Sequence, residues 1–144
     1  MNIFFIIICS IFILSTNSAW STELKIDVHN IDVNIGGNIV VMFFGKEGSP
    51  KSHGVALLIQ IKPALHKTME FIFDVDIEEL AVKVLHDETG DGKVTKNWTG
   101  IWPKEGLGFS NKQKISLKGA PKYKCSKLLK KQFENGINIS ITYP

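Results

Sequence analysis

Hydrophobic and polar residues alternate along most of the chain, which is the pattern of a strand with one buried face. Leu24, Ile26 and Val28 alternate with Lys25 and Asp27. The same period of two recurs in three later segments, at 71–76, 80–84 and 137–143. Because successive side chains of a strand point to opposite faces, each of these segments predicts a strand that contributes one face to a core.

Two other apolar segments show almost no alternation. Residues 39–44 and 55–61 are nearly continuous in apolar side chains, which predicts strands in the centre of a sheet. Turn-forming residues separate the strands, with Gly36 and Gly37 before the first segment and a stretch that contains Pro50 before the second. Several short strands divided by turns predict an all-β fold, a single antiparallel β-sandwich.

A segment near the C-terminal end fits two kinds of structure. Helical spacing is shown by Cys125, Leu128, Leu129 and Phe133, but Tyr123, Cys125 and Leu129 also share one face of a strand. We favour the strand.

The first 21 residues predict a signal peptide. Residues 3–14 form an apolar run of 12 residues, whereas a helix that spans a bilayer needs about 20. Small residues at Ala19 and Ser21 fit the positions before a cleavage site, so we place the cut after Ser21, with a cut after Ala19 as the alternative. We therefore expect a signal peptide, 1–21, followed by a β-sandwich domain, 22–144. The protein would be exported, periplasmic or secreted, and not an integral membrane protein after cleavage.

Cleavage would leave a single cysteine in the domain. Cys9 belongs to the predicted signal peptide, and Cys125 remains. No disulfide within the domain is then possible. A free cysteine is usually buried as a small hydrophobic side chain, so we expect Cys125 in the interior.

Basic charge is carried by lysine alone and is segregated along the chain. All 17 basic residues are Lys, whereas Arg dominates specific contacts with nucleic acids, so we expect no nucleic-acid partner. Residues 70–91 carry eight acidic side chains and one Lys (net −7), and residues 93–131 carry eleven Lys and one Glu (net +10). Lysines keep strand faces solvated, which is the explanation we favour. The alternative is a cationic face that meets anionic surface polymers or lipid headgroups.

The segment 85–111 lacks the alternating pattern and is long for a loop, which is typical of functional loops. It reads HDETGDGK at 86–93, then Asn97, then GIWPKEGLGFSN at 100–111. These motifs resemble an uncharacterised bacterial family, domain of unknown function 2141. The resemblance implies an exported protein with an immunoglobulin- or transthyretin-like sandwich, and it implies no known activity. The loop-motif residues that it singles out are His86, Asn97, Glu105, Ser110 and Asn111.

Aromatic residues are expected to pin this segment to the sandwich; they are Trp98, Trp102 and Phe109. The part from Lys104 onward is expected to be structural, because glycines at 106 and 108 allow close approach of the backbone.

The first half of the segment also resembles half of a calcium-binding loop. The ligands would be the side chains of Asp87, Thr89 and Asp91 and the main-chain oxygen of Lys93. The closing carboxylate is missing, because Trp98 stands where a calcium loop has Glu. The alternative, which we favour, is that the aspartates accept hydrogen bonds from their own turns. Calcium is the one cofactor that the sequence suggests.

His86 beside Asp87 could act as a general base, with Ser110 as the only hydroxyl of the motif able to serve as its nucleophile. Ser110 lacks the sharp strand-to-helix turn that activates such a serine. The other three histidines are scattered without metal-ligand spacing. His86 also continues the buried face of the preceding strand, as a histidine at the edge of the core would. We expect no catalytic residues and no enzyme.

The combined expectation is an exported, non-enzymatic binding or interaction module of the cell envelope, with the loop end of the sandwich as its contact surface. Its partner would be an anionic envelope polymer or a protein. The alternatives are a structural or assembly partner and a small hydrolase that uses His86 and Asp87.

Overall fold

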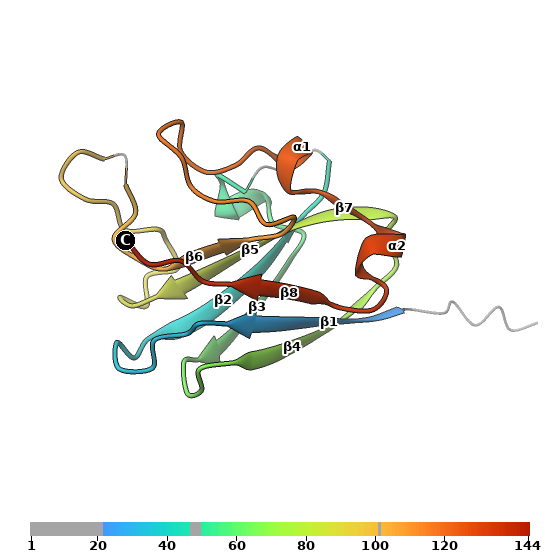
Figure 1. Ribbon diagram of the computed structural model, residues 1–144, viewed down its shortest axis with the longest axis horizontal. Helices are drawn as coiled ribbons and strands as arrows, with labels where there is room; N and C mark the ends of the chain where they lie inside the picture. Colours follow the sequence, from blue (N-terminus) through green and yellow to red (C-terminus); the bar gives the residue numbers. More distant parts are fainter. Residues whose placement is uncertain (1–21, 47–49, 101) are drawn as a thin grey trace, which may run out of the picture.

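The computed structural model describes residues 22–46, 50–100 and 102–144, which form two β-sheets (Figure 1). The three-stranded sheet has the order β4 (Met69–Val75), β1 (Thr22–His29), β8 (Ile137–Ser140). The five-stranded sheet has the order β3 (Leu58–Pro63), β2 (Asn38–Phe44), β5 (Glu79–Asp87), β6 (Leu107–Phe109), and β7 (Leu128–Leu129) pairs with the start of β5. The prediction of an all-β, sandwich-like fold is confirmed.

The main core lies between the two sheets and uses the alternating positions. In the three-stranded sheet, Leu24 is paired with Phe73, and Ile26 with Phe71. These side chains pack in one buried cluster with Val41 and Phe43 from β2 and with Val82 and Val84 from β5. The rings of Phe43 and Phe73 lie 4.3 Å apart between their centroids and join the two sheets. The period-two prediction is therefore confirmed for these strands.

The prediction of purely antiparallel sheets is wrong at one pair of strands. β8 runs parallel to β1, from Ile26 opposite Ile137 to His29 opposite Ser140. A parallel neighbour requires a long crossover connection. Here the connection is residues 30–136, which contain all the elements between the two strands, because β1 and β8 are the first and last described strands.

The prediction of a central strand over 55–61 is also wrong. Residues His53–Val55 form a short 3-10 helix (η1), and β3 begins at Leu58 and lies at the edge of the five-stranded sheet. Ile59 and Ile61 are 51% and 57% exposed. An unbroken apolar run shows that neither face is polar, but only the order of strands decides whether a strand has neighbours on both sides.

The five-stranded sheet buries its outer face as well as its inner face. Val40, Met42 and Phe44 of β2 pack there in a second cluster with Leu85 and Phe109. The segments on either side of β6 lie over this face (Figure 1). Because both faces of β2 are covered, its sequence shows no alternation, and the prediction of a central strand over 39–44 is confirmed.

The prediction of a strand around Cys125 is wrong, except for the two residues of β7. Two single-turn helices, α1 (Tyr123–Ser126) and α2 (Lys130–Phe133), flank that two-residue strand. Cys125 is exposed, which corrects the expectation of burial. A single helical turn buries few side chains, and in α1 the buried residue is Ser126.

The predicted signal peptide lies outside the described residues, and β1 begins directly after it at Thr22. In the part of the chain that the structure describes, no helix has the length and apolar character needed to cross a membrane.

Candidate functional site

The turn after β5 is organised by the buried carboxylate of Asp87. Its Oδ1 accepts a hydrogen bond from the Gly90 N–H at 2.7 Å, and its Oδ2 accepts one from the Gly92 N–H at 2.8 Å. Asp91 in turn accepts a hydrogen bond from the Lys93 N–H at 2.8 Å. The turn-forming role of the two aspartates is thus confirmed. Within the described ranges no three His, Cys, Asp or Glu side chains gather closely enough to hold a metal ion, and the calcium hypothesis stays a prediction.

A second buried carboxylate, Glu105, ties the two ends of the same segment together. One of its oxygens accepts a hydrogen bond from the Glu88 N–H at 3.2 Å, and the other from the Thr95 N–H at 2.7 Å. Both partners are backbone groups that would otherwise lack an acceptor in this turn. The sequence motif contains Glu105 but gives no sign that it is buried.

His86 is fully buried at the end of β5, and both of its ring nitrogens are hydrogen-bonded. Nε2 donates to the carbonyl oxygen of Gly36 at 2.6 Å, because a carbonyl can only accept. In the neutral imidazole Nδ1 then accepts from the hydroxyl of Tyr143 at 2.7 Å, and the same hydroxyl accepts from the Asp32 N–H at 2.9 Å. This arrangement is that of a histidine at the edge of the core, because both ring nitrogens have partners within the protein.

The remaining loop-motif residues also make internal hydrogen bonds. The Ser110 hydroxyl accepts from the Val82 N–H at 2.9 Å and donates to the Ser126 carbonyl at 2.5 Å. The Asn111 amide donates to the Cys125 carbonyl at 2.8 Å, and Asn97 accepts from the Thr99 hydroxyl at 2.6 Å. These contacts fasten β6 and its neighbouring turns to the sandwich.

The glycines before and within β6 permit close packing against the C-terminal strand. A Cβ atom on Gly108 would lie 2.6 Å from a side-chain carbon of Ile139, so only glycine fits there. Phe109 is buried, as predicted. The prediction that Trp98 pins the segment is wrong, because its side chain is 95% exposed.

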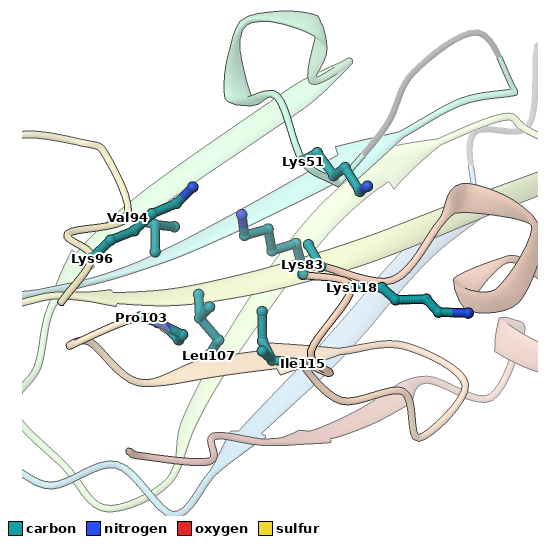
Figure 2. A pocket seen from close by; sticks show the side chains of 10 residues that line it. Lys51, Lys83, Val94, Lys96, Pro103, Leu107, Ile115 and Lys118 are labelled. Atoms are coloured by element: carbon teal, nitrogen blue, oxygen red, sulfur yellow. The ribbon is translucent and has the colours of Figure 1, made fainter. Parts of the chain in front are cut away.

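A group of lysines lines the outer side of the five-stranded sheet, and two of them, Lys96 and Lys118, belong to the lysine-rich segment 93–131 for which a cationic face was the alternative explanation. A cavity of about 240 Å³ lies over β5 and β6, and the lysines around it are Lys51, Lys83, Lys96 and Lys118. Its apolar wall is formed by Val94, Pro103, Leu107, Ile115 and Ala120. Figure 2 shows Lys83 rising from β5 between Lys96 and Lys51, whereas the ammonium of Lys118 points away from the other three.

A second hollow of about 370 Å³ continues the first one, because the two share Lys51, Val94 and Lys96. It adds His53 and Lys93 to the lining. None of the described residues that line these two hollows is acidic. We call the two hollows together the lysine groove; its lysines are Lys51, Lys83, Lys93, Lys96 and Lys118.

Lys83 is the most buried of these lysines, with 2% of its surface exposed. Its ammonium donates to the Pro50 carbonyl at 2.9 Å and to Nε2 of His53 at 2.8 Å. Burial, helped by the charge of Lys96, lowers the pKa of Lys83 from 10.5 to about 8. No carboxylate lies within ion-pair distance of Lys83 in the described part of the chain.

His53 is held in its neutral form beside this lysine. Burial and then the charge of Lys83 lower the pKa of His53 below 6.5. Its Nδ1 donates to the Gly92 carbonyl at 2.9 Å, which leaves Nε2 as the acceptor for Lys83. An ammonium has three hydrogens, and these two acceptors use two of them. The third is left for an acceptor in the cavity that Lys83 lines.

In the alternating segment 80–84, Lys83 falls on the face opposite Leu80, Val82 and Val84. The signal of a site was weak, because a lysine on the outer face of a strand is ordinary. It becomes buried only because distant segments, around Pro50 and Ile115, cover that face.

The comparisons with known proteins place the chain in one family. The sequence model of a family described as "Uncharacterized protein conserved in bacteria (DUF2141)" matches residues 26–137, from β1 to the first residue of β8. No curated protein and no solved structure matches the chain significantly. The matched range is well over half of the 144 residues and contains the loop motifs that carry the resemblance. The chain therefore belongs to the DUF2141 family of uncharacterised bacterial proteins.

Proposed function

We propose that the protein is an exported, non-enzymatic binding module of the cell envelope, whose lysine groove takes an anionic component of that envelope. The supporting observation is Lys83, a buried ammonium with no carboxylate partner among the described residues. A buried charge is costly unless an opposite charge pairs with it. An anion in the groove would supply that charge.

The surroundings of Lys83 favour an anion over any other ligand. Four more lysines line the groove, and none of the described lining residues is acidic, so the local potential is positive. The apolar wall beside the lysines lowers the local dielectric and strengthens each charged hydrogen bond. Lysine provides charge without the bidentate geometry of Arg, which suits a ligand with repeated or interchangeable anionic groups.

Loops that cover one face of the five-stranded sheet form much of the groove. Loops are the parts of a β-sandwich whose sequence varies most and that most often bind ligands. We take the sandwich to be immunoglobulin- or transthyretin-like, in line with the sequence motifs. The hydrogen-bonding of His86 and Ser110 favours a non-enzymatic role over the hydrolase alternative. An assembly partner remains the second candidate, and a stable oligomer in light scattering would favour it.

The test is binding of long-chain polyphosphate, a soluble polyanion, measured by isothermal titration calorimetry. We expect Lys83→Met combined with Lys96→Gln to weaken binding at least about tenfold, because a hydrogen bond to a charged group contributes about 1.5–3 kcal/mol. The matched control is Lys67→Gln together with Lys131→Gln, two exposed lysines outside the lining of the groove, which removes the same charge. Equal loss in both double variants would show nonspecific attraction and contradict the proposal.

A further inference from the structure

Two exposed apolar side chains stand at the tips of the two turns that flank the lysine groove. Isolated bridges close these turns, one between Lys96 and Pro103 and one between Ser116 and Gly119. The first turn carries Trp98, which is 95% exposed, and the second carries Leu117, which is 79% exposed. They are the two most exposed large hydrophobic side chains among the described residues.

The two turns lie next to each other, because both contribute to the same cavity. Lys96 and Pro103 line it from the first turn, and Lys118 and Gly119 from the second. Figure 1 shows the two turns, gold and orange, on the same side of the five-stranded sheet. The apolar tips are therefore separated by a groove that is lined by lysine.

The fold does not use these tips for its own stability. Exposure of an aliphatic side chain such as Leu117 to water does not stabilise the fold. An exposed Trp on a turn is typical of a surface that enters the boundary between water and lipid. Lysine near an anionic membrane surface contributes about 1 kcal/mol per residue. Apolar tips around a cationic centre match the two layers of a membrane surface, in which anionic headgroups cover hydrocarbon.

We infer that the partner of the groove is the surface of an anionic phospholipid bilayer. Lipid phosphates would occupy the lysine groove, while Trp98 and Leu117 enter between the headgroups. This inference rests on the proposed function and names its ligand. A soluble polyanion would pair with the lysines but would leave Leu117 in water, so the pair of apolar tips favours lipid over an envelope polymer.

The experiment is sedimentation of the chain with vesicles, using residues 22–144, which contain every described strand and helix and omit the apolar segment 3–14. We expect binding to vesicles of equal parts phosphatidylcholine and phosphatidylglycerol, and none to phosphatidylcholine alone. Trp98→Ser with Leu117→Ser should weaken binding at least about tenfold, since burying each side chain is worth more than about 1 kcal/mol. The matched control is Leu65→Ser, which removes a 68% exposed leucine from the turn between β3 and β4.

A spectroscopic arm reports insertion directly. In a Trp102→Phe background, Trp98 is the single tryptophan of residues 22–144. Its emission should shift to shorter wavelength with anionic vesicles and be quenched by brominated lipid chains. Unchanged emission with bound vesicles would overturn the inference.

The outcomes also separate this inference from the proposed function. Polyphosphate binding that depends on Lys83, without vesicle binding, would overturn the lipid inference and leave the proposed function standing. Vesicle binding that the tip substitutions do not weaken would overturn the insertion of the tips. Failure with both probes would contradict both proposals.

Discussion

The Nδ1 atom of His86 lies 2.7 Å from the phenolic oxygen of Tyr143, and this hydrogen bond fastens the end of β5 to the end of the chain. The same oxygen accepts the Asp32 N–H, so one hydroxyl joins three segments that are far apart in the sequence. Burial raises the pKa of Tyr143, which keeps the hydroxyl protonated and able to donate.

Tyr143→Phe should lower the free energy of unfolding by about 1–3 kcal/mol, because it leaves the buried Nδ1 of His86 without a donor. Denaturant unfolding followed by circular dichroism measures the change. Tyr123→Phe is the matched control; it removes a hydroxyl whose partner, Glu79, already has Lys127 as a second donor. A loss as large in the control as in Tyr143→Phe would refute the assignment.

Glu105→Gln should also destabilise the protein, by about 1.5–3 kcal/mol, because it removes the charge and leaves one acceptor oxygen for two backbone N–H groups. Exposed Glu88 in the same segment provides the matched control, and Glu88→Gln should change the stability by less than about 0.5 kcal/mol. Glutamine keeps only one acceptor oxygen, so amide hydrogen exchange should show that the N–H of Glu88 or of Thr95 loses protection in Glu105→Gln alone. Retained protection of both N–H groups would contradict the role of Glu105.

Lys83 should make the protein more stable as the pH rises above about 8. Below its folded-state pKa of about 8 the lysine is charged whether folded or unfolded, so the cost of burying the charge is fully present. Between about 8 and 10.5 the unfolded chain binds more protons than the folded one, so stability increases with pH, by at most about 1.4 kcal/mol per unit.

Comparison with Lys83→Met isolates this contribution. The unfolding free energy of the wild type minus that of the variant should increase steadily from pH 8 to pH 10. Tyr123, whose pKa is raised to about 12 by burial and by Glu79, opposes the effect only at higher pH and is common to both proteins. A difference that stays constant over this range would show that the folded-state pKa of Lys83 is not lowered.

Calcium separates the two roles considered for Asp87. Since both of its carboxylate oxygens accept backbone N–H groups, we expect the melting temperature to be equal in chelator and in millimolar calcium. Asp87→Ala should lower the melting temperature by the same amount in both conditions, through loss of the turn. A rise of several degrees with calcium, absent in Asp87→Ala and in Asp91→Ala, would instead establish a metal-ordered loop.

Alternation predicted the strands whose two faces meet different surroundings. Leu24, Ile26 and Val28 face the core while Lys25 faces solvent, so the local sequence is enough to predict both the strand and its buried face. The edge position of β3 and the parallel pairing of β8 were not predictable in this way, because both depend on which distant strand becomes the neighbour.

The central residue of the candidate site, Lys83, was missed for a related reason. The loop motif drew attention to Asp87 and Glu105, which shape the turns, but the groove depends on Lys83, an ordinary lysine in an alternating strand. Lys83 is a buried cation only because segments from elsewhere in the chain cover its face of the sheet. The residues next to Lys83 in the sequence do not reveal that its face will be covered.

The parallel pairing of β8 with β1 sets the order in which this protein can fold. The first described strand, β1, pairs with β4 on one side and with the last strand, β8, on the other, so its pairing cannot be complete before β8 has been synthesised. Until Ile137, Ile139 and Ile141 emerge from the ribosome, the core lacks three of its buried side chains and one edge of β1 has no neighbouring strand. Contacts between such distant residues close late in folding. Completion of both the core and the three-stranded sheet therefore depends on the last strand of the chain.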